Sequence, residues 1–180
     1  MYGIDILLQE HEKTLTLIDK IHEQCLKDFE SNDIDIEFYN KVLDIGRNYV
    51  DKHHHGKEEE ILFKIMIETL PSNIEHIIND GMLADHKIGR YYLESLEWSI
   101  KDYKAMGGEK NLLDVITNAN GYANLMESHI MKENEVLYPY AIENLKEEDK
   151  KKINDKIMEA EKLAESKNIQ NKYNSLISIL

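Results

Sequence analysis

The sequence contains very few residues that break helices or crosslink a chain. Its 180 residues include one cysteine, Cys25, two prolines, Pro71 and Pro139, and eight glycines. A single cysteine excludes an internal disulfide, and it also excludes a thiolate cluster for zinc or for iron and sulfur. Because proline and glycine are scarce, little material remains for the turns of a β-rich fold. The composition therefore favours long helices.

The chain also lacks an excess of basic charge and a long apolar run. Its 35 Asp and Glu residues outnumber its 22 Lys and Arg residues, for a net charge of −13. Nucleic acids and anionic membranes repel such a chain, so we expect neither as a partner. No stretch is as long and apolar as a membrane span, and the first residues do not resemble a secretory signal. We therefore expect a cytoplasmic protein, either a monomer or a homodimer.

Apolar residues and histidines recur at spacings of three and four, which predicts amphipathic helices. The predicted helices cover residues 3–29, 35–70, 82–106 and 109–144, while 72–81 is ambiguous. Pro139 should kink the fourth helix near its end. Four long helices with short connections predict an all-α fold, an antiparallel up-down four-helix bundle.

The last part of the chain differs from the rest because it is rich in Lys and Glu. We expect the bundle to occupy residues 1–145 and a C-terminal helical extension to occupy 146–180, packed on or beside the bundle. This extension reads as a charged helix, from about residue 147, followed by a short appendage. The apolar pairs Leu176–Ile177 and Ile179–Leu180 could bind a partner or a second copy of the chain.

The sequence repeats internally at a distance of 75 residues. The segment HHGKEEEILF (54–63) aligns with HIMKENEVLY (129–138) without a gap, and Gly46 aligns with Gly121. The shift also aligns histidine with histidine and glutamate with glutamate: His11 with His86, His54 with His129, and Glu58 with Glu133. We interpret the repeat as two helix hairpins related by a pseudo-two-fold axis, each supplying one single histidine and one His-x-x-x-Glu pair.

The repeated residues have the chemistry of a metal site. A His and a Glu four positions apart in a helix project from the same face, so one helix offers an imidazole and a carboxylate to one small volume. Two such pairs and two single histidines provide four nitrogens and two carboxylates, a set suited to iron, manganese or zinc. Apolar residues flank all of them, and burying unpaired ions would cost several kcal/mol. The pattern therefore predicts a buried two-metal site.

Four motifs resemble those of the hemerythrin-like HHE cation-binding family: DILLQEH (5–11), HHGKEEEILF (54–63), DHKIGR (85–90) and HIMKENEVLYP (129–139). The similarity covers about residues 1–145. The resemblance implies six metal ligands: His11, His54, Glu58, His86, His129 and Glu133. It also implies two iron ions, bridged by both glutamates and by an oxo or hydroxo group. Manganese and zinc rank below iron.

One departure from the family concerns the third helix. Oxygen-carrying hemerythrins have a further histidine one turn after the third-helix ligand, and Arg90 stands there in this chain. With two six-coordinate irons, the implied ligand set leaves two positions open, where the oxygen carriers leave one. More open positions favour reaction with oxygen, peroxide or nitric oxide. His55, about 100° round the helix from His54, is a possible additional ligand, or else a residue facing solvent or a neighbouring ligand.

Four further residues lie close to the predicted ligands along the chain. Tyr122 precedes His129 by two helical turns, so it either points its hydroxyl towards a bound ligand or packs in the core. Glu10 and Asp85 neighbour His11 and His86 in sequence and could orient imidazoles across the bundle. Arg90 could offset negative charge near the site.

The sequence leaves two kinds of function open. The first is a non-haem di-iron protein that binds and reduces a small oxidant, namely oxygen, peroxide or nitric oxide, with an unidentified redox partner protein. The second is a non-catalytic protein that senses, stores or transfers oxygen, nitric oxide or iron. Both need the same ligands, so the sequence does not decide whether the protein is an enzyme. A zinc-stabilised structural bundle ranks last, because structural zinc normally has four ligands.

Overall fold

The computed structural model describes residues 1–180, and it contains helices and no strands. The elements are α1 (Tyr2–Ser31), α2 (Ile36–Ile45), η1 (Gly46–His55), η2 (Glu58–Leu62), α3 (Phe63–Thr69), α4 (Asn73–Ile77), η3 (Ile78–Met82), α5 (Leu83–Met106), α6 (Glu109–Lys132), η4 (Glu133–Leu137), α7 (Tyr138–Asn144), α8 (Glu147–Ser166) and α9 (Ile169–Ser178). Several of these follow one another without a break and form longer helical stretches. The predicted all-α class is confirmed.

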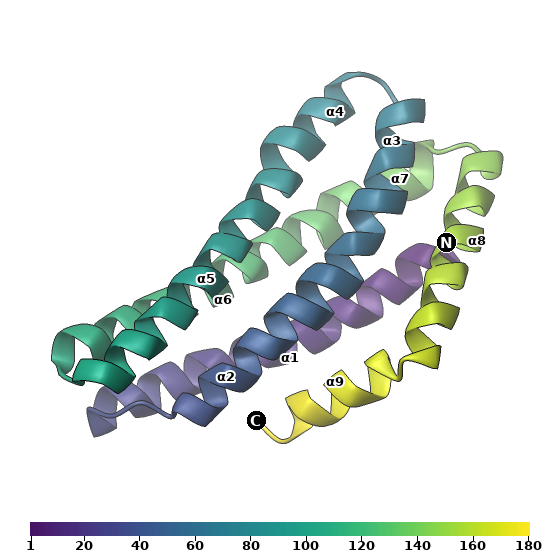
Figure 1. The fold of residues 1–180 in the computed structure, drawn as a ribbon. Helices are drawn as coiled ribbons and strands as arrows, with labels where there is room; N and C mark the ends of the chain where they lie inside the picture. Colours follow the sequence, from purple (N-terminus) through teal and green to yellow (C-terminus); the bar gives the residue numbers. More distant parts are fainter.

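Four long stretches form the bundle: α1, α2 to α3, α4 to α5, and α6 to α7 (Figure 1). The α6 helix packs against both α1 and α5, and α5 also packs against α2 and η1. Short loops connect consecutive stretches, so neighbours run in opposite directions. This is the predicted up-down bundle, with one addition: the ambiguous segment 72–81 is helical and lengthens the third stretch.

Four π-helical segments, η1 to η4, interrupt the regular helices. In the second and fourth stretches they include the predicted metal ligands His54, Glu58 and Glu133. A π-helical turn is wider than an α-helical one and is common at functional sites. In the fourth stretch the π-helical segment precedes Pro139, which lies at the start of α7. The deviation from a regular helix thus begins before the proline.

The hydrophobic core has two parts, and the predicted ligands lie between them. On α1, Leu7 belongs to one cluster and Leu17 to the other, with His11 between them in sequence. On the second stretch, Val50 and Leu62 belong to different clusters and flank the His54–Glu58 pair in the same way. The apolar packing on both sides therefore encloses a polar layer across the middle of the bundle.

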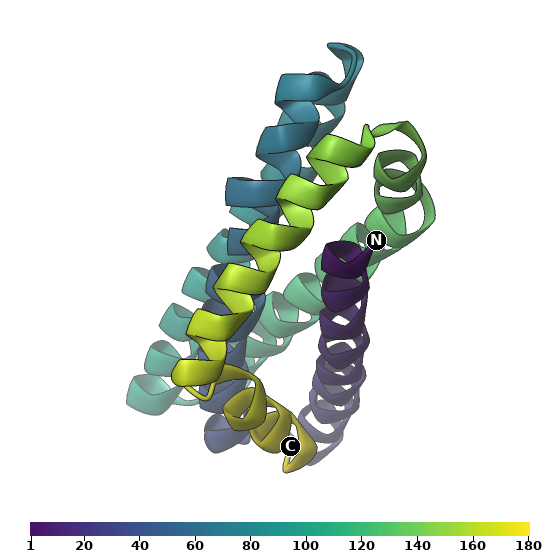
Figure 2. The same cartoon turned by 90° about the vertical axis from the view of Figure 1, so that its right-hand side faces the viewer.

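The C-terminal extension forms two helices rather than one helix with a short appendage. The helix is interrupted at Asn168, whose backbone is left-handed with φ of 55°, a conformation that asparagine tolerates better than most residues. Figure 2 shows α8 and α9 crossing the front of the bundle from one end to the other. The α8 helix contacts α1, η2 and α3, while α9 contacts α1 and α2.

Both helices of the extension contribute to the core of the bundle. Their buried side chains join the two clusters and are Ile153, Ile157, Tyr173 and Ile177. The prediction that Ile177 could bind a partner is wrong, because this side chain is buried against its own chain. Ile179, in contrast, is exposed. None of the helices is long and apolar enough to cross a membrane.

Candidate metal centre

The structure brings all six predicted ligands into one buried layer. Each of them is at most 1% exposed. Their donor atoms form two groups, and within each group the atoms lie within 4.8 Å of one another. One group, called here the N-terminal half, contains His11, His54, Glu58 and Glu133; the other, called the central half, contains His55, His86, His129 and Glu58.

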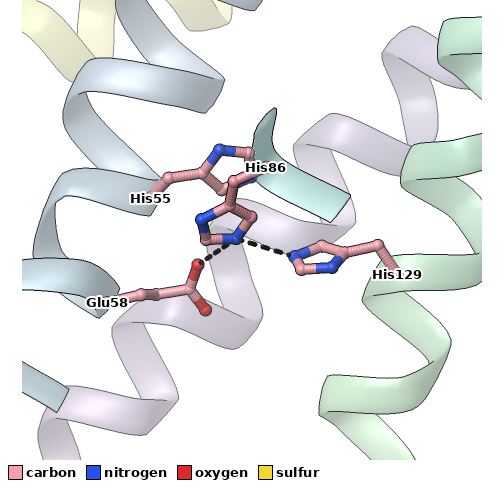
Figure 3. Close-up of side chains that lie close together, drawn as sticks. All are labelled: His55, Glu58, His86 and His129. Atoms are coloured by element: carbon pink, nitrogen blue, oxygen red, sulfur yellow. Dashed lines mark hydrogen bonds and ion pairs between the residues drawn. The ribbon is translucent and has the colours of Figure 1, made fainter. Parts of the chain in front are cut away.

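The imidazoles meet in pairs through their Nε2 atoms. The Nε2 atoms of His11 and His54 are 2.9 Å apart, and those of His86 and His129 are 3.1 Å apart. Figure 3 shows His86 facing both His129 and Glu58 in the central half. In all four rings the other nitrogen, Nδ1, faces an oxygen acceptor, as described below. These outer contacts orient each ring so that its Nε2 atom points inward, towards the other predicted ligands.

The two carboxylates lie between the halves. Glu58 Oε2 is 3.7 Å from His54 Nε2 and 3.5 Å from His86 Nε2. Glu133 Oε2 is 3.2 Å from the Nε2 atoms of both His11 and His129. Glu58 Oε2 and both oxygens of Glu133 are buried without a hydrogen-bond donor. Since buried polar atoms are almost always paired, these oxygens are available to ligate a cation.

Burial controls the protonation of the centre when no cation is present. It lowers the pKa of His54 to about 3 and that of His129 to about 4, so both rings are neutral at physiological pH. Burial also raises the pKa of Glu133 to about 8. For Glu58, burial and the nearby charge of Glu133 raise the pKa well above its usual range. Neutral imidazoles are the form that binds metal, and a cation would allow the glutamates to ionise.

The donor set fits two divalent or trivalent cations. Facing lone pairs on Nε2 atoms about 3 Å apart repel each other unless a proton or a cation lies between them. Three of the four oxygens of Glu58 and Glu133 are buried without a donor, and a cation would offset the cost of their burial. Each half supplies at least two imidazoles, and both carboxylates face both halves. These His and Glu clusters could thus bind metal cations.

Each inward-facing histidine is oriented by an oxygen on a neighbouring helix. Glu10 accepts from His54 Nδ1 (2.9 Å), and Asp85 accepts from His129 Nδ1 (3.4 Å). These are the two acidic residues that the sequence placed beside the ligands, and each one reaches the histidine on the other helix of its own hairpin. Such outer hydrogen bonds fix the ring and raise the basicity of the nitrogen that binds metal.

The other two histidines use acceptors that the sequence analysis did not identify. Asn134 Oδ1 accepts from His11 Nδ1 (2.6 Å), and Glu59 Oε1 accepts from His86 Nδ1 (2.7 Å). Glu59 and Asn134 are themselves 75 residues apart. The repeat therefore contained the signal that would have found them. The hydrogen bond from His86 lowers the pKa of Glu59 to about 2, so this carboxylate is charged.

Tyr138 is a further residue that the sequence analysis missed. Its ring stacks on His11 with centroids 5.4 Å apart, and its hydroxyl donates a short hydrogen bond to Glu58 Oε1. Tyr122, by contrast, is buried with a hydroxyl that has no hydrogen-bond partner. The structure thus joins Tyr138, and not Tyr122, to the ligands by a hydrogen bond.

Arg90 lies at the edge of the centre and bridges two acidic side chains. Its guanidinium donates to Asp51 (2.7 Å) and to Glu59 (2.7 Å). Glu59 in turn holds His86, so Arg90 acts on the centre through this carboxylate. Arg90 itself is exposed.

The two other histidines of the second helix are both turned inward. His55 is 4% exposed, and its ring stacks on His86 with centroids 3.8 Å apart and an interplanar angle of 9°. His53 does not face solvent either: its side chain is 8% exposed and its Nε2 lies 2.8 Å from Glu10 Oε1. The π-helical turn reduces the angle between successive residues, and Glu161 and Gln170 of the C-terminal extension lie against His53.

The space beside the ligands is small. It is too narrow to hold a water-sized sphere, and it is lined by His11, Thr14, Val50, His54, His55, Met126, His129 and Ile130. Pockets that bind drug-sized ligands or cofactors usually measure about 300 to 1,000 Å³. The side chains around the predicted ligands are therefore tightly packed and leave no room for a ligand of that size.

Comparison with protein families agrees with this arrangement. Residues 2–141 match the family described as the hemerythrin HHE cation binding domain, and this range contains every ligand named above. Searches of curated proteins and of solved structures found no match. The match covers most of the chain and ends shortly before the C-terminal extension. The chain belongs to the hemerythrin HHE cation-binding family.

Proposed function

We propose that this protein holds two iron ions and binds a small oxidant, namely oxygen, peroxide or nitric oxide. The observation that carries the proposal is the convergence of four histidine Nε2 atoms on two buried carboxylates, three of whose four oxygens lack a hydrogen-bond donor. Imidazole and carboxylate ligands suit iron as well as manganese and zinc, and the family resemblance favours iron. Bound iron would supply the redox chemistry that a protein of these side chains alone lacks.

The two halves would supply different numbers of histidines. His11 and His54 would hold one ion, while His86, His129 and His55 would hold the other, with Glu58 and Glu133 shared between them. His55 thus provides a third histidine to the central half from the second helix, where Arg90 has replaced the third-helix histidine of the oxygen carriers. On this count the N-terminal half has one ligand fewer, and a small oxidant would bind there.

Tyr138 is placed to act on such an oxidant. Its hydroxyl is 3.5 Å from His11 Nε2 and donates to Glu58, so it lies beside the position where the N-terminal half has fewer ligands. A hydroxyl there would donate a hydrogen bond to bound ligand or supply a proton to it. The apolar residues Val50, Met126 and Ile130 line the adjoining space and limit the entry of water.

The second candidate is a non-catalytic protein that senses, stores or transfers oxygen, nitric oxide or iron. The small space beside the ligands favours it, because no room remains next to the ions for an organic reductant. An enzyme built on this centre would receive its electrons from a partner protein through the surrounding helices. The two candidates share the same ligands and differ in whether the bound oxidant is turned over.

The test combines a metal count with a turnover assay. We expect protein purified without oxygen to contain about two irons per chain, and to develop oxo-bridge absorption after oxygen or peroxide is added, a change that is missing in the double variant Glu58→Ala, Glu133→Ala. Repeated consumption of peroxide or nitric oxide with an added reductant would establish the enzyme, whereas a stable stoichiometric adduct would establish the binder. Absence of iron, or one zinc ion with no response to oxidant, would overturn the proposal.

A further inference from the structure

Glu10 lies at the centre of a buried polar network that its counterpart Asp85 does not have. Besides His54, the Glu10 carboxylate accepts from Lys57 Nζ (2.5 Å) and from Gln170 Nε2 (2.9 Å), and His53 Nε2 lies 2.8 Å away. Burial acts to raise the pKa of Glu10, but His53, His54 and Lys57 together hold it well below its usual range. Glu10 is thus a buried, fully paired carboxylate.

Two of the residues in this network belong to the C-terminal extension. Glu161 of α8 accepts from Lys57 Nζ (2.5 Å), and its Oε1 is 3.4 Å from His53 Nε2. Gln170 of α9 donates to Glu10, and its own Oε1 accepts from Tyr49 Oη (3.2 Å). The network therefore joins the extension to the bundle directly behind the ligand His54.

The equivalent position in the central half is open to solvent. Asp85 accepts from His129 and from Lys132 Nζ (2.9 Å), and Lys132 is the residue 75 positions after Lys57. The Lys132 side chain is 49% exposed, whereas that of Lys57 is 4% exposed. No residue of the extension makes a hydrogen bond to Asp85 or Lys132. In both halves a carboxylate accepts hydrogen bonds from a predicted ligand histidine and from a lysine. The C-terminal extension covers this arrangement only in the N-terminal half.

The same network could be read as a third cation site, because Glu10, His53 and Glu161 lie close together. The Lys57 ammonium, however, lies 2.5 Å from an oxygen of each carboxylate. It occupies the place that a metal ion would take and supplies the positive charge. The cluster is therefore a structural network held by a lysine.

We propose that the C-terminal extension positions one half of the metal centre. Glu161 and Gln170 hold the Glu10–Lys57–His53 network, and Glu10 in turn fixes the ring of His54 with its Nε2 towards the ion. The extension thereby makes the ion of the N-terminal half slower to leave than it would be without these contacts. This inference rests on the proposed two-metal function, and it assigns a role to residues outside the range that matches the family.

The test measures the release of each ion separately. Protein is loaded with Co²⁺ without oxygen, excess EDTA is added, and the loss of the cobalt spectrum is followed with time. His54→Ala and His129→Ala identify which kinetic phase belongs to which half. The test variant is Gln170→Ala, and the matched control is Asn174→Ala, which changes an exposed residue of the same helix.

We expect Gln170→Ala to accelerate release from the N-terminal half about tenfold, the lower end of what loss of an outer partner costs a metal site. Release from the central half and both phases of Asn174→Ala should match the wild type. Glu161→Gln, which keeps an oxygen near Lys57 but removes the charge, should give a smaller acceleration of the same phase.

Equal acceleration of both phases would mean that the extension only stabilises the fold, and unchanged kinetics would mean that it does not act on the centre. Either result overturns the positioning role and leaves the two-metal function intact. A wild-type protein that binds fewer than two Co²⁺ ions would overturn the two-metal function, and the positioning role with it.

Discussion

The two halves of the centre are built from the same repeat and yet differ at three places. His55 belongs to the central half, and the residue 75 positions later is Ile130, which contributes no ligand. Tyr138 stacks on His11 and donates to Glu58, whereas its counterpart Phe63 stacks on His86 without a hydroxyl. The C-terminal extension covers the N-terminal half alone.

With two ions bound as proposed, these differences would give the two ions different surroundings. The central half has an extra imidazole, so it is the better filled. The N-terminal half has fewer ligands, but it has a tyrosine hydroxyl beside it and a rigid support behind His54. The repeat thus supplies two halves with the same inner residues that differ at a few positions, and Glu58 and Glu133 lie between the halves.

Removal of both metal ions should have the largest effect on the stability of the fold. The effect should also differ between the two halves, because the C-terminal extension holds only the N-terminal half in place. An ion present at about a thousand times its dissociation constant stabilises the fold by about 4 kcal/mol, which corresponds to about 10 °C in the unfolding midpoint of a chain this size. We expect the metal-free protein to unfold at least that much earlier. Hydrogen exchange measured by mass spectrometry should then show more loss of protection around His86 and His129 than around His54, where the extension remains attached. An equal loss of protection in both regions would contradict the claim that the C-terminal extension supports only the N-terminal half.

Replacing the extra histidine should make the halves alike. In His55→Ile the central half carries the residue of its counterpart, and we expect its ion to bind at least about 100-fold more weakly, the upper end of what even an outer partner costs. The ion of the N-terminal half should be retained. A titration with Co²⁺ measures both affinities, and His76→Ala, which changes an exposed histidine far along the chain, serves as the control. Two unchanged affinities would show that His55 is not a ligand.

The shared carboxylates should make both ions respond to pH together. Without a cation the pKa of Glu133 is about 8, so at pH 7 this carboxyl is protonated and must lose its proton when metal binds. The affinity should therefore rise by about tenfold per pH unit for each proton released, up to about pH 8, and then level off. In the metal-free protein the sign is opposite: the unfolded chain ionises this group at lower pH, so stability falls as pH rises from about 5 to 8. Calorimetry in buffers of different ionisation enthalpy counts the protons.

A smaller effect on metal affinity should follow when the residue that accepts the Nδ1 hydrogen bond of His86 is changed to resemble the one that serves His11. Glu59→Gln gives His86 a neutral acceptor, as Asn134 gives His11, and we expect the ion of the central half to bind up to about tenfold more weakly. Glu60→Gln changes an exposed neighbour and is the matched control. If the two variants bind metal equally well, the charge on Glu59 does not contribute to the centre.

The fold class and the convergence of the ligands followed from the sequence because both depend on local periodicity and on the repeat. Helix spacing predicted the four long stretches, and the shift of 75 residues indicated which histidines and glutamates would meet. The repeat also aligns Glu59 with Asn134 and Lys57 with Lys132, although among its aligned residues only the ligands, and Glu10 with Asp85, had been interpreted as functional. The outer partners of two histidines could therefore have been predicted from the same alignment.

The orientation of His53 and His55 could not be predicted from a regular helix. An angle of 100° per residue places these side chains away from His54, but the wider π-helical turn brings both inward. Nor could spacing show that Tyr138, rather than Tyr122, would reach Glu58, because both lie two turns or so from His129 and the choice depends on the start of α7. The contacts of Glu161 and Gln170 depend on how the extension packs, which a charged helix with few apolar residues does not specify.

The central claim is that the chain holds two bridged and unlike iron ions. Mössbauer spectroscopy of protein loaded with ⁵⁷Fe tests it most directly, because each iron environment gives its own doublet and coupling between ions is visible in an applied field. We predict two doublets of equal area from a coupled pair, with two irons per chain. A single doublet, uncoupled ions or fewer than two irons per chain would contradict the account.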